Sequence, residues 1–536
     1  MEYGPFFNIV QLDSPETDIA RLLGFDEPIV DLGARRLVRI LAGSGCRTVV
    51  EEIEYIDSDF RDGYRRFYYL HHKDVARRCK RLHFFATNVT ADDLWVMTAS
   101  VTDRYLGSVV LRPIPSHQLG TTFLSPKVIH SSYPGAYAEE RRDVLCVANH
   151  TLNIAGNSVR HLATPWIQQD SQVAACASSS IWIANRYMSE QFPRDFQLFT
   201  TAAITDHAVR FNLDTGRGMP SNGLTVEQML LALRSMGYES LYIEPETPQA
   251  AYSLATHYLR SQIPVIMIIS LPGRGGHATT LVGHTTTNQK RVVNAEPVRD
   301  RYTTFFDDIS AYVPRFIMQD DSGGPFRFAE IYTPAEAALQ AGITDEALQA
   351  GITDEEWSVL LRDGGPCIVR IDGETDCADI ALLQSMVIPL PRRVTLSDDL
   401  AQRNAKRIVD HLLVKENRLT DSTLIFDTYL RPSNEYKAWW SPPSPRPQDI
   451  APIVRRHLFP HWVWVTDLCR VEGEGWSIIG QIVQDSSGRG TDDIFDDVVA
   501  LLFPDGVSMC SPDGKMNSSP REPEAAPIAT AAFGQT

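Results

Sequence analysis

The chain lacks three features that would assign it to a simple class: a long basic run, a long apolar run and paired cysteines. Its 536 residues carry a formal net charge of -17, and the densest basic cluster, RRCKR at 77–81, is short. Nucleic-acid binding needs a positive surface to neutralise phosphates, so it is not expected. No segment approaches the roughly 20 apolar residues of a membrane span, so membrane insertion is not expected either.

The eight cysteines are scattered along the chain, and none forms a C-x-x-C pair. This pattern argues against a zinc ribbon and a disulfide framework, and it favours a reducing, cytoplasmic location. The N-terminal stretch MEYGPFFNIV has neither the basic start nor the long apolar core of a signal peptide. We also expect no metal ion and no cofactor, because no H-E-x-x-H, Walker or complete G-x-G-x-x-G pattern occurs.

Length and hydrophobic patterning predict a multidomain α/β (α+β) protein. In chain order, the predicted parts are a mixed α/β domain of unassigned role (1–160), a central domain (161–335), a linker (336–358), a second α/β domain (359–508) and a disordered tail (509–536). The linker contains ALQAGITDE twice in tandem, and the N-terminal domain includes LWVMTA, at 94–99, as an expected strand.

The stretch QQDSQVAAC, at 168–176, ends in a cysteine that leads into a run with a helical pattern. At a helix N-terminus the macrodipole and the free backbone N–H groups stabilise an anion, which would favour the thiolate of Cys176. Nucleophilic catalysis by cysteine also needs a base that accepts the thiol proton. His277 follows the apolar strand PVIMIISLP and a Gly-rich turn, so it is the candidate base.

A carboxylate that accepts the second imidazole N–H would hold the tautomer that a general base requires. In FIMQDDSGGPF, at 316–326, an apolar strand ends in Asp320 and Asp321. Each candidate also has a structural interpretation, because free cysteine is often buried and acids are common in turns. His277 could cap a turn in the same way.

The order of glutamine, cysteine at a helix start, histidine at a strand start and aspartate after the next strand resembles the papain-like cysteine peptidases. Within that class, QQDSQVAAC, GLTVEQMLLALRSMGY, IPVIMIISLPGRGGHATTLVGH and QDDSGG are similar to segments of the bacterial double-glycine (bacteriocin-leader) peptidases. The resemblance covers about 160–330, roughly a third of the chain, and implies a papain-like fold for the central domain. It implies these roles: Cys176 as nucleophile, His277 as general base, Asp320 as orienting acid, Gln169 as oxyanion-hole donor, and Asp321 as the alternative acid.

The sequence departs from the family pattern near the nucleophile. The family has glutamine six residues before the cysteine, whereas that position is Asp170 here and Gln169 lies one residue further back. Ala175 replaces an aspartate and Ala177 a glycine. The family activity would be acyl transfer through a thioester, as a peptidase or related hydrolase, with a polypeptide substrate or partner protein.

Two alternatives remain open. The altered glutamine spacing also fits a non-enzymatic interaction protein that retains a peptidase-like scaffold. A third hypothesis places the activity in the N-terminal domain, where LGSVVLRPI is similar to an acetyltransferase strand, although no acetyl-CoA phosphate loop follows it.

Overall fold

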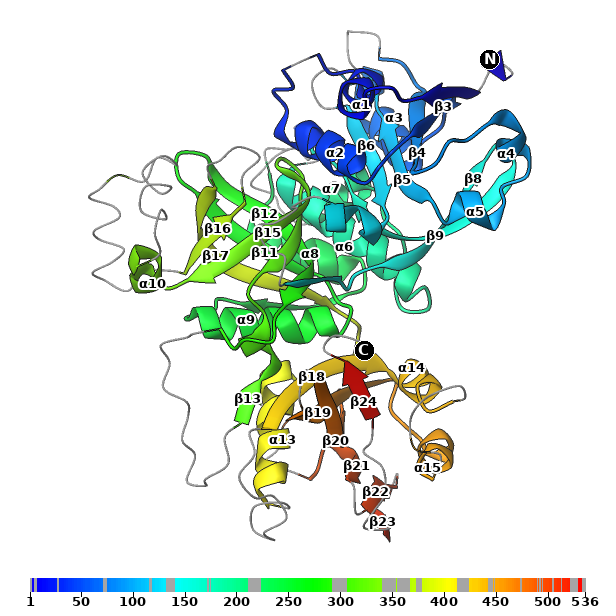
Figure 1. The fold of residues 1–536 in the computed structure, drawn as a ribbon. Coiled ribbons are helices and arrows are strands. Elements are labelled where there is room, and N and C mark those ends of the chain that lie inside the picture. The colour runs from blue at the N-terminus through cyan, green and yellow to red at the C-terminus, as the bar shows by residue number, and fades with distance from the viewer. Residues whose placement is uncertain are drawn as a thin grey trace. The chain divides into compact units, whose positions relative to one another are not determined.

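The computed structural model describes most of the chain, and the helices and strands are labelled in Figure 1. The described residues are 2–3, 7–26, 28–70, 75–114, 118–131, 140–170, 173, 175–210, 223–291, 306–339, 353, 367–372, 378–411, 424–441, 447, 449–472, 475–488, 490, 493, 495–503, 506–511, 513–520 and 529–532. They form an α+β fold in which nearly all strand pairs are antiparallel. None of the helices in these ranges combines the length and the hydropathy that crossing a membrane requires.

The chain divides into two units rather than the predicted three domains. Unit 1 comprises Met1–Pro248, Ile263–His284 and Arg315–Pro391, and unit 2 comprises Gln249–Gln262, Thr285–Pro314 and Arg392–Thr536. The predicted boundary at 160 therefore lies inside unit 1. The predicted linker at 336–358 does not separate the units either, and most of its tandem repeat lies outside the described residues.

The first sheet of unit 1 is eight-stranded in the described residues. In spatial order its strands are β1 (Glu2–Tyr3), β2 (Phe7–Gln11), β3 (Thr48–Tyr55), β4 (Cys79–Phe85), β5 (Tyr105–Leu111), β6 (Leu119–Leu124), β9 (Asn157–Trp166) and β8 (Ala148–Ile154). The helices in this part of the chain are α1 (Pro15–Leu23), α2 (Leu32–Gly43), α3 (Ser58–Arg66), α4 (Ala91–Trp95) and α5 (Ala99–Thr102).

The strand predicted at 94–99 is wrong, because the chain there forms the end of α4 and the start of α5. Thr90 is the N-cap of α4, and its hydroxyl accepts from the Asp93 N–H at 3.3 Å while the Asp93 carboxylate accepts from the Thr90 N–H at 2.8 Å. This reciprocal capping box satisfies two backbone donors and starts a helix despite the β-branched and aromatic residues that follow.

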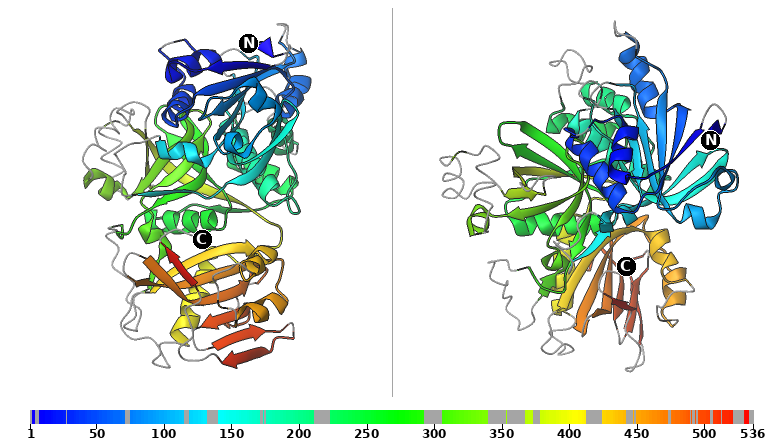
Figure 2. Two further views of the ribbon diagram at one scale, coloured as in Figure 1. Left: turned by 45° about the vertical axis from the view of Figure 1, so that its right-hand side comes forward. Right: turned by 45° about the horizontal axis from the view of Figure 1, so that its top comes forward.

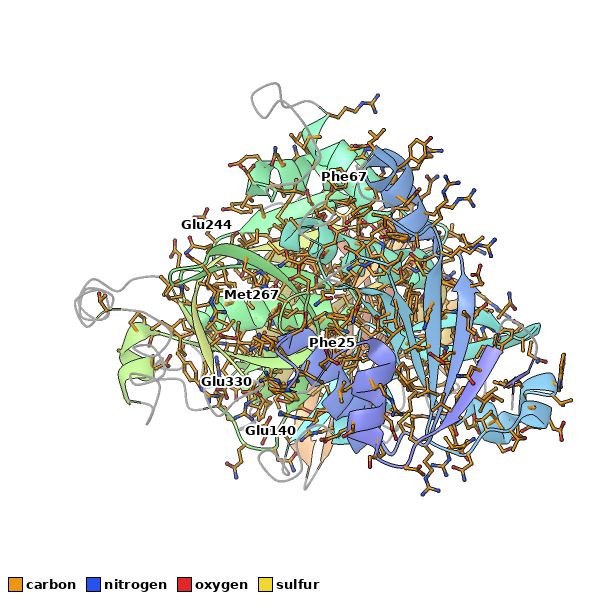
Figure 3. All side chains as sticks on the ribbon, turned by 90° about the horizontal axis from the view of Figure 1, so that it is seen from above. Phe25, Phe67, Glu140, Glu244, Met267 and Glu330 are labelled. Atoms are coloured by element: carbon orange, nitrogen blue, oxygen red, sulfur yellow. The ribbon has the colours of Figure 1, made fainter. Side chains whose placement is uncertain are left out.

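The second sheet of unit 1 closes on itself. Its ladder runs β17 (Asp379–Leu390), β11 (Val265–Leu271), β12 (Gly275–Thr286), β14 (Phe316–Asp320), β15 (Gly324–Tyr332) and β16 (Ile368–Ile371), and β16 pairs back with β17. β10 (Glu239–Ile243) continues from β17, and β7 (Arg141–Val144) pairs with β12. Closure leaves no free edge between these six strands. Met267 of β11, labelled in Figure 3, is fully buried.

The strands β16 and β17 lie in the sequence predicted as the C-terminal domain, but they complete this barrel instead. Both contain runs of apolar residues, and such a pattern indicates a strand without indicating which sheet it joins. Sequence separation from β14 and β15 suggested a separate domain, but antiparallel pairing of Ala329 with Ile371 and of Ile268 with Ser385 joins them to unit 1.

The helix α6 (Cys176–Gln191) is buried along almost its whole length. Ile181, Trp182, Ile183 and Ala184 are successive residues, and each is at most 2% exposed. A helix that is buried on all sides is held by its surroundings rather than by one apolar stripe. The other helices of this part are α7 (Thr201–Val209), α8 (Val226–Ser235) and α10 (Pro334–Leu339).

Unit 2 contains one sheet with helices packed on both faces. Its strands are β13 (Phe306–Asp308), β18 (Leu424–Pro432), β19 (Trp462–Glu472), β20 (Gly475–Asp485), β21 (Val498–Phe503), β22 (Gly506–Cys510) and β23 (Met516–Pro520), with β24 (Ala529–Ala532) pairing with β20. Its helices are α9 (Pro248–Arg260), α13 (Asp398–Val409), α14 (Ser433–Ala438) and α15 (Ala451–Arg456). The strands lie side by side in both views of Figure 2.

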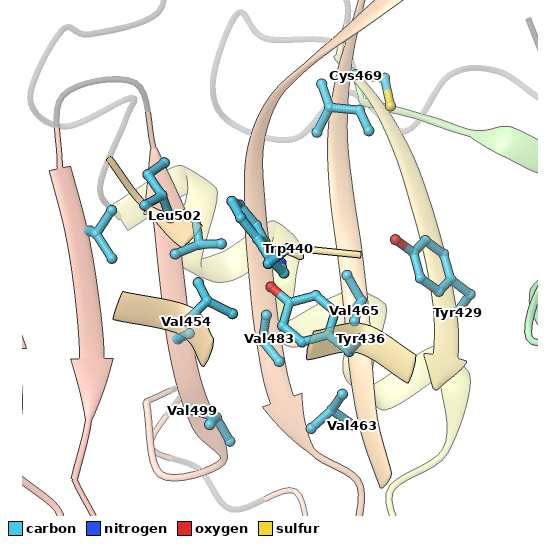
Figure 4. Packing of buried hydrophobic residues seen from close by; sticks show 14 of the residues in the cluster. Tyr429, Tyr436, Trp440, Val454, Val463, Val465, Cys469, Val483, Val499 and Leu502 are labelled. Atoms are coloured by element: carbon cyan, nitrogen blue, oxygen red, sulfur yellow. The ribbon is translucent and has the colours of Figure 1, made fainter. Parts of the chain in front are cut away.

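Buried side chains of α13 pack on one face of this sheet, where they meet Leu468 and Ile482. Residues of α14 and α15 cover the other face, and Figure 4 shows Tyr436 and Trp440 against Val465 and Val483. The predicted disordered tail is wrong for β23 and β24, which extend this sheet. Apart from Met516, the residues of these two strands are small or polar, so composition gives little sign of them, and backbone pairing defines the strands.

A buried ion cluster joins three segments within unit 2. His257 in α9 contacts Asp398 through Nδ1 and Asp308 through Nε2, both at 2.9 Å. Burial alone would lower the pKa of His257, but the two carboxylates outweigh it and raise the pKa to about 10. The ion pairs therefore contribute fully below about pH 6.5, the ordinary value for histidine, and their contribution is lost as the pH rises through the folded value.

We predict that His257→Gln lowers the free energy of unfolding of unit 2 by about 3–5 kcal/mol at neutral pH, because it leaves buried carboxylates without their cation. The difference from the unmodified protein should shrink as the pH approaches 10. Hydrogen exchange of β18–β20, read by mass spectrometry, measures it. His411→Gln, an exposed site in the same unit, is the control, and equal protection in both variants would refute the prediction.

Candidate active site

Cys176 is the first residue of α6, as the sequence predicts. Ala175 precedes it in an extended conformation, and the Ser178 hydroxyl accepts from the Ala175 N–H at 3.0 Å. The backbone N–H groups of the first helical turn have no acceptor within the helix, so the thiol lies beside a group of donors that stabilise an anion. Unlike five of the other described cysteines, which are buried, Cys176 is partly exposed.

Direct hydrogen bonds dock α6 against β12. The Ser180 hydroxyl donates to the Ala278 carbonyl at 2.8 Å, and the Thr280 hydroxyl donates to the Ser180 carbonyl at 3.1 Å. Ala278 is the neighbour of His277, so this docking places the histidine next to the start of α6. Cys176 and His277 line the same cavity, and the Cys176 side chain is one of the groups that raise the pKa of His277.

The imidazole of His277 lies between the thiol and a carboxylate. Its Nε2 is 3.0 Å from Oδ1 of Asp320. This contact leaves Nδ1 as the ring nitrogen for Cys176. Burial alone would lower the pKa of His277, but the charge of Asp320 and the hydrogen bonds to Asp320 and Cys176 raise it well above its usual value. The ring therefore carries a proton that it can share with the sulfur.

Asp320 is buried, and two cations hold it in the charged form. Besides His277, the Arg327 guanidinium contacts it, with Nη1 2.7 Å from Oδ2. Burial alone would raise the pKa of Asp320, but the charges of His277 and Arg327 and a backbone hydrogen bond from Gly323 hold it well below its usual range. The Asp320 carbonyl accepts from the Trp166 indole at 2.8 Å, which also fixes the backbone of this residue.

Asp321 reaches the same imidazole less closely, with Oδ1 3.6 Å from Nε2 of His277. Its Oδ2 is buried without a hydrogen-bond partner among the described residues. Burial and the adjacent charge of Asp320 raise the pKa of Asp321 to about 7. Of the two acids that the sequence offers, Asp320 therefore has the geometry of the orienting carboxylate.

The turn after Asp320 depends on glycine. A Cβ at Gly323 would lie 2.2 Å from Nη1 of Arg327 and 2.6 Å from Oδ2 of Asp320, so only glycine leaves room for their ion pair. From the N-terminal region, the buried Arg36 of α2 donates to the Pro325 carbonyl at 2.6 Å and to the Phe326 carbonyl. The N-terminal region thus supports the acid-bearing turn directly.

Gln169 also reaches the site. Its Nε2 donates to the Ser322 hydroxyl at 3.1 Å, in the turn after Asp320. Its two neighbours serve the structure instead: Gln168 donates to Asp31 at 2.6 Å, and Asp170 accepts from the Tyr68 hydroxyl at 2.8 Å. The residue six positions before the cysteine is therefore turned into the protein, and the next glutamine lies at the cavity.

One cavity of about 300 Å³ is lined by four of the five residues to which the family resemblance gives roles, Asp321 being the exception. Cys176, Gln169, His277 and Asp320 line it together with Arg274 and Asp379. Its apolar wall is formed by Leu32, Ile269, Leu271 and Ile371. The arrangement supplies a nucleophile, a protonated base, a fixed carboxylate and an amide donor around one space.

Sequence reasoning missed Arg327, which joins the site to the barrel. Its guanidinium also binds Asp379 at 2.7 Å and the Asp372 carbonyl at 2.6 Å. An arginine within the apolar strand GPFRFAEIY was the available signal, because a buried charge requires a partner. His277, Asp320 and Asp321 also place potential metal-ligating atoms within 4.8 Å of one another, although Arg327 already neutralises part of this negative charge.

Comparisons with protein-family models, with curated proteins and with solved structures find no match for this chain. The geometry of the site must therefore be interpreted from its own residues.

We predict that Asp320→Asn lowers the pKa of His277 far more than Asp321→Asn does, because the closer carboxylate stabilises the imidazolium. NMR titration of histidine-labelled protein measures both effects, with His277→Ala identifying the resonance. An equal or larger effect of Asp321→Asn would show that the second acid, not the first, orients the ring.

Proposed function

We propose that the chain is a cysteine-dependent acyl-transfer enzyme, a peptidase or related hydrolase with a papain-like fold in unit 1. The observation that carries the proposal is that Cys176, at the start of a buried helix, lines one cavity with His277 and Asp320, and that His277 contacts Asp320. A thiol, an imidazole and a carboxylate in this order activate a nucleophile and supply the proton for a leaving amine.

In the proposed reaction, the Cys176 thiolate attacks a substrate carbonyl carbon and forms a tetrahedral oxyanion. The backbone N–H of Cys176 and the Gln169 amide are the donors available to it, and each such donor typically lowers the barrier by about 3 kcal/mol. For Gln169 this requires exchange of its bond to Ser322 for one to substrate. The carbon–nitrogen bond then breaks, and His277 gives its proton to the departing amine.

Deacylation reverses the proton transfer. His277 removes a proton from water, the resulting hydroxide attacks the thioester, and the carbon–sulfur bond breaks to release a carboxylic acid and the thiolate. Asp320 keeps the ring oriented through both steps and remains ionised. We further propose a polypeptide substrate and a reducing, cytoplasmic setting, with which the seven free cysteines of the described residues are compatible.

An interaction protein that retains the scaffold without activity is the second candidate. The bond between Gln169 and Ser322 favours it, because it occupies the amide that the oxyanion would need. The two candidates differ in whether Cys176 can be acylated.

We predict that p-nitrophenyl acetate acetylates Cys176 at least about 100-fold faster in the unmodified protein than in the His277→Ala variant. General base catalysis contributes at least this factor. Intact-mass spectrometry follows the single acetyl adduct and its loss by hydrolysis. Cys510→Ala, which removes another partly exposed thiol, is the matched control and should change nothing. If Cys176 reacts no faster than Cys510, the protein is an interaction protein rather than an enzyme. If Cys176 reacts faster, incubation with a peptide library identifies the substrate class, and the Cys176→Ala variant should cleave none of the peptides.

A further inference from the structure

Unit 1 contains a second cavity, of about 420 Å³, which Trp182 and Arg186 of α6 help to line. Strands β3–β6 form its floor, the segment 150–153 of β8 forms one wall, and Trp182 and Arg186 of α6 form another. The segments 57–59 and 198–200 close it. None of the residues assigned to the thiol site lines this cavity, so it is a separate feature that does not rest on the proposed function.

The cations that line the cavity already have partners. Arg81 contacts Glu52 through Nη2 at 2.7 Å, and the same Nη2 donates to the Asn153 carbonyl at 2.7 Å. Arg186 contacts Glu190 at 2.9 Å. Each arginine is thus paired with a glutamate, and neither forms an ion pair with a further acid among the described residues.

Two further acids, Asp57 and Asp59, line the cavity without such a counter-ion. Asp57 accepts from the Phe60 N–H at 2.8 Å, and Asp59 accepts from the N–H and the hydroxyl of Thr201 at 2.8 and 2.9 Å. These donors are neutral, and neither acid forms an ion pair with a described residue. Asp57 is 4% and Asp59 is 6% exposed, so solvent supplies little compensation.

Leaving two carboxylates buried side by side without a cation is costly. Burial raises the pKa of both groups, and for Asp59 burial together with the charge of Asp57 raises it to about 7. The charge of Arg112 acts on both acids and that of Arg186 on Asp57, but burial outweighs these charges, and no described cation forms an ion pair with either acid. A cation bound in the cavity would therefore be the closest counter-ion that allows both acids to stay ionised.

The remaining walls suit an organic cation better than a hydrated metal ion. Tyr55, Phe123, Trp182 and Phe199 contribute aromatic faces or edges to the cavity. The existing guanidinium groups show that these rings accept cations, since Arg81 lies 4.1 Å from the centre of the Tyr55 ring and Arg186 lies 5.0 Å from that of Phe123. The Nε of Arg186 is buried with no hydrogen-bond partner among the described atoms, which leaves a donor for a ligand oxygen.

We propose that this cavity binds a small organic amine, whose ammonium group pairs with Asp57 and Asp59 and whose carbon chain lies against the aromatic wall. The volume falls within the usual range for small-molecule sites. An amine that also carries a carbonyl oxygen could accept from Arg186, so an amino-acid amide should bind more tightly than a plain diamine.

Isothermal titration of the full chain tests the proposal with three probes. 1,4-Diaminobutane should bind with a Kd of about 1 mM or tighter, lysinamide should bind more tightly, and the neutral isostere 1,4-butanediol should not bind. Asp57→Asn retains an N-cap acceptor for α3 and should weaken diamine binding at least about tenfold. Asp59→Asn should have an effect of similar size.

Asp92→Asn removes an exposed acid from the same part of unit 1 and is the matched control, with unchanged binding expected. Melting curves show whether each variant folds. If Asp59→Asn does not fold, the Asp57→Asn variant and the comparison of diamine with diol still test whether the cavity binds an amine. Absence of binding for both amines, equal binding of diol and diamine, or unchanged affinity in Asp57→Asn would each overturn the proposal.

Discussion

The candidate active site depends on the carboxylate of Asp320, which lies buried between two cations. On one side it contacts His277 and on the other Arg327. The pair with Arg327 keeps the carboxylate charged, and the charged carboxylate in turn keeps His277 protonated beside Cys176. A buried group of this kind is stable only while every member is present, because removing one leaves an unpaired charge. The same contacts of Asp320 therefore determine both the protonation of His277 and the stability of this part of the fold.

The surrounding fold serves this arrangement from three directions. The closed barrel carries His277 on β12, Asp320 on β14 and Arg327 on β15. The pairing of these strands fixes the positions of the three residues relative to one another. Helix α6 brings Cys176 to the barrel through Ser180. The N-terminal region, predicted as an independent domain, contributes Arg36 to the turn that follows the acid. This last contact is one of several that join the N-terminal and central regions, which belong to one unit.

Local patterns in the sequence predicted the elements that carry the site. The start of α6 at Cys176 and the strands that bear His277 and Asp320 occur as predicted. Each of these signals is contained in one short segment. The strand predicted at 94–99 failed because the capping residue Thr90 precedes the apolar run and outweighs its strand propensity.

Properties that depend on distant pairing could not be predicted. The membership of β16 and β17 in the barrel is decided by partners far along the chain, and their apolar pattern is compatible with either unit. The choice between Asp320 and Asp321 depends on which carboxylate meets Arg327, a residue of the following strand. The second cavity has no sequence motif at all, because its acids and aromatic rings come from separate strands and helices.

The most direct test of the central claim is the rate of Cys176 alkylation by limiting iodoacetamide between about pH 5 and 8, measured by intact mass. If His277 and Asp320 hold a thiolate–imidazolium pair, Cys176 reacts faster than every other cysteine and stays reactive at the acidic end, and His277→Ala and Asp320→Asn lose that acidic reactivity. A rate for Cys176 that matches Cys510 and rises only toward alkaline pH would contradict the account.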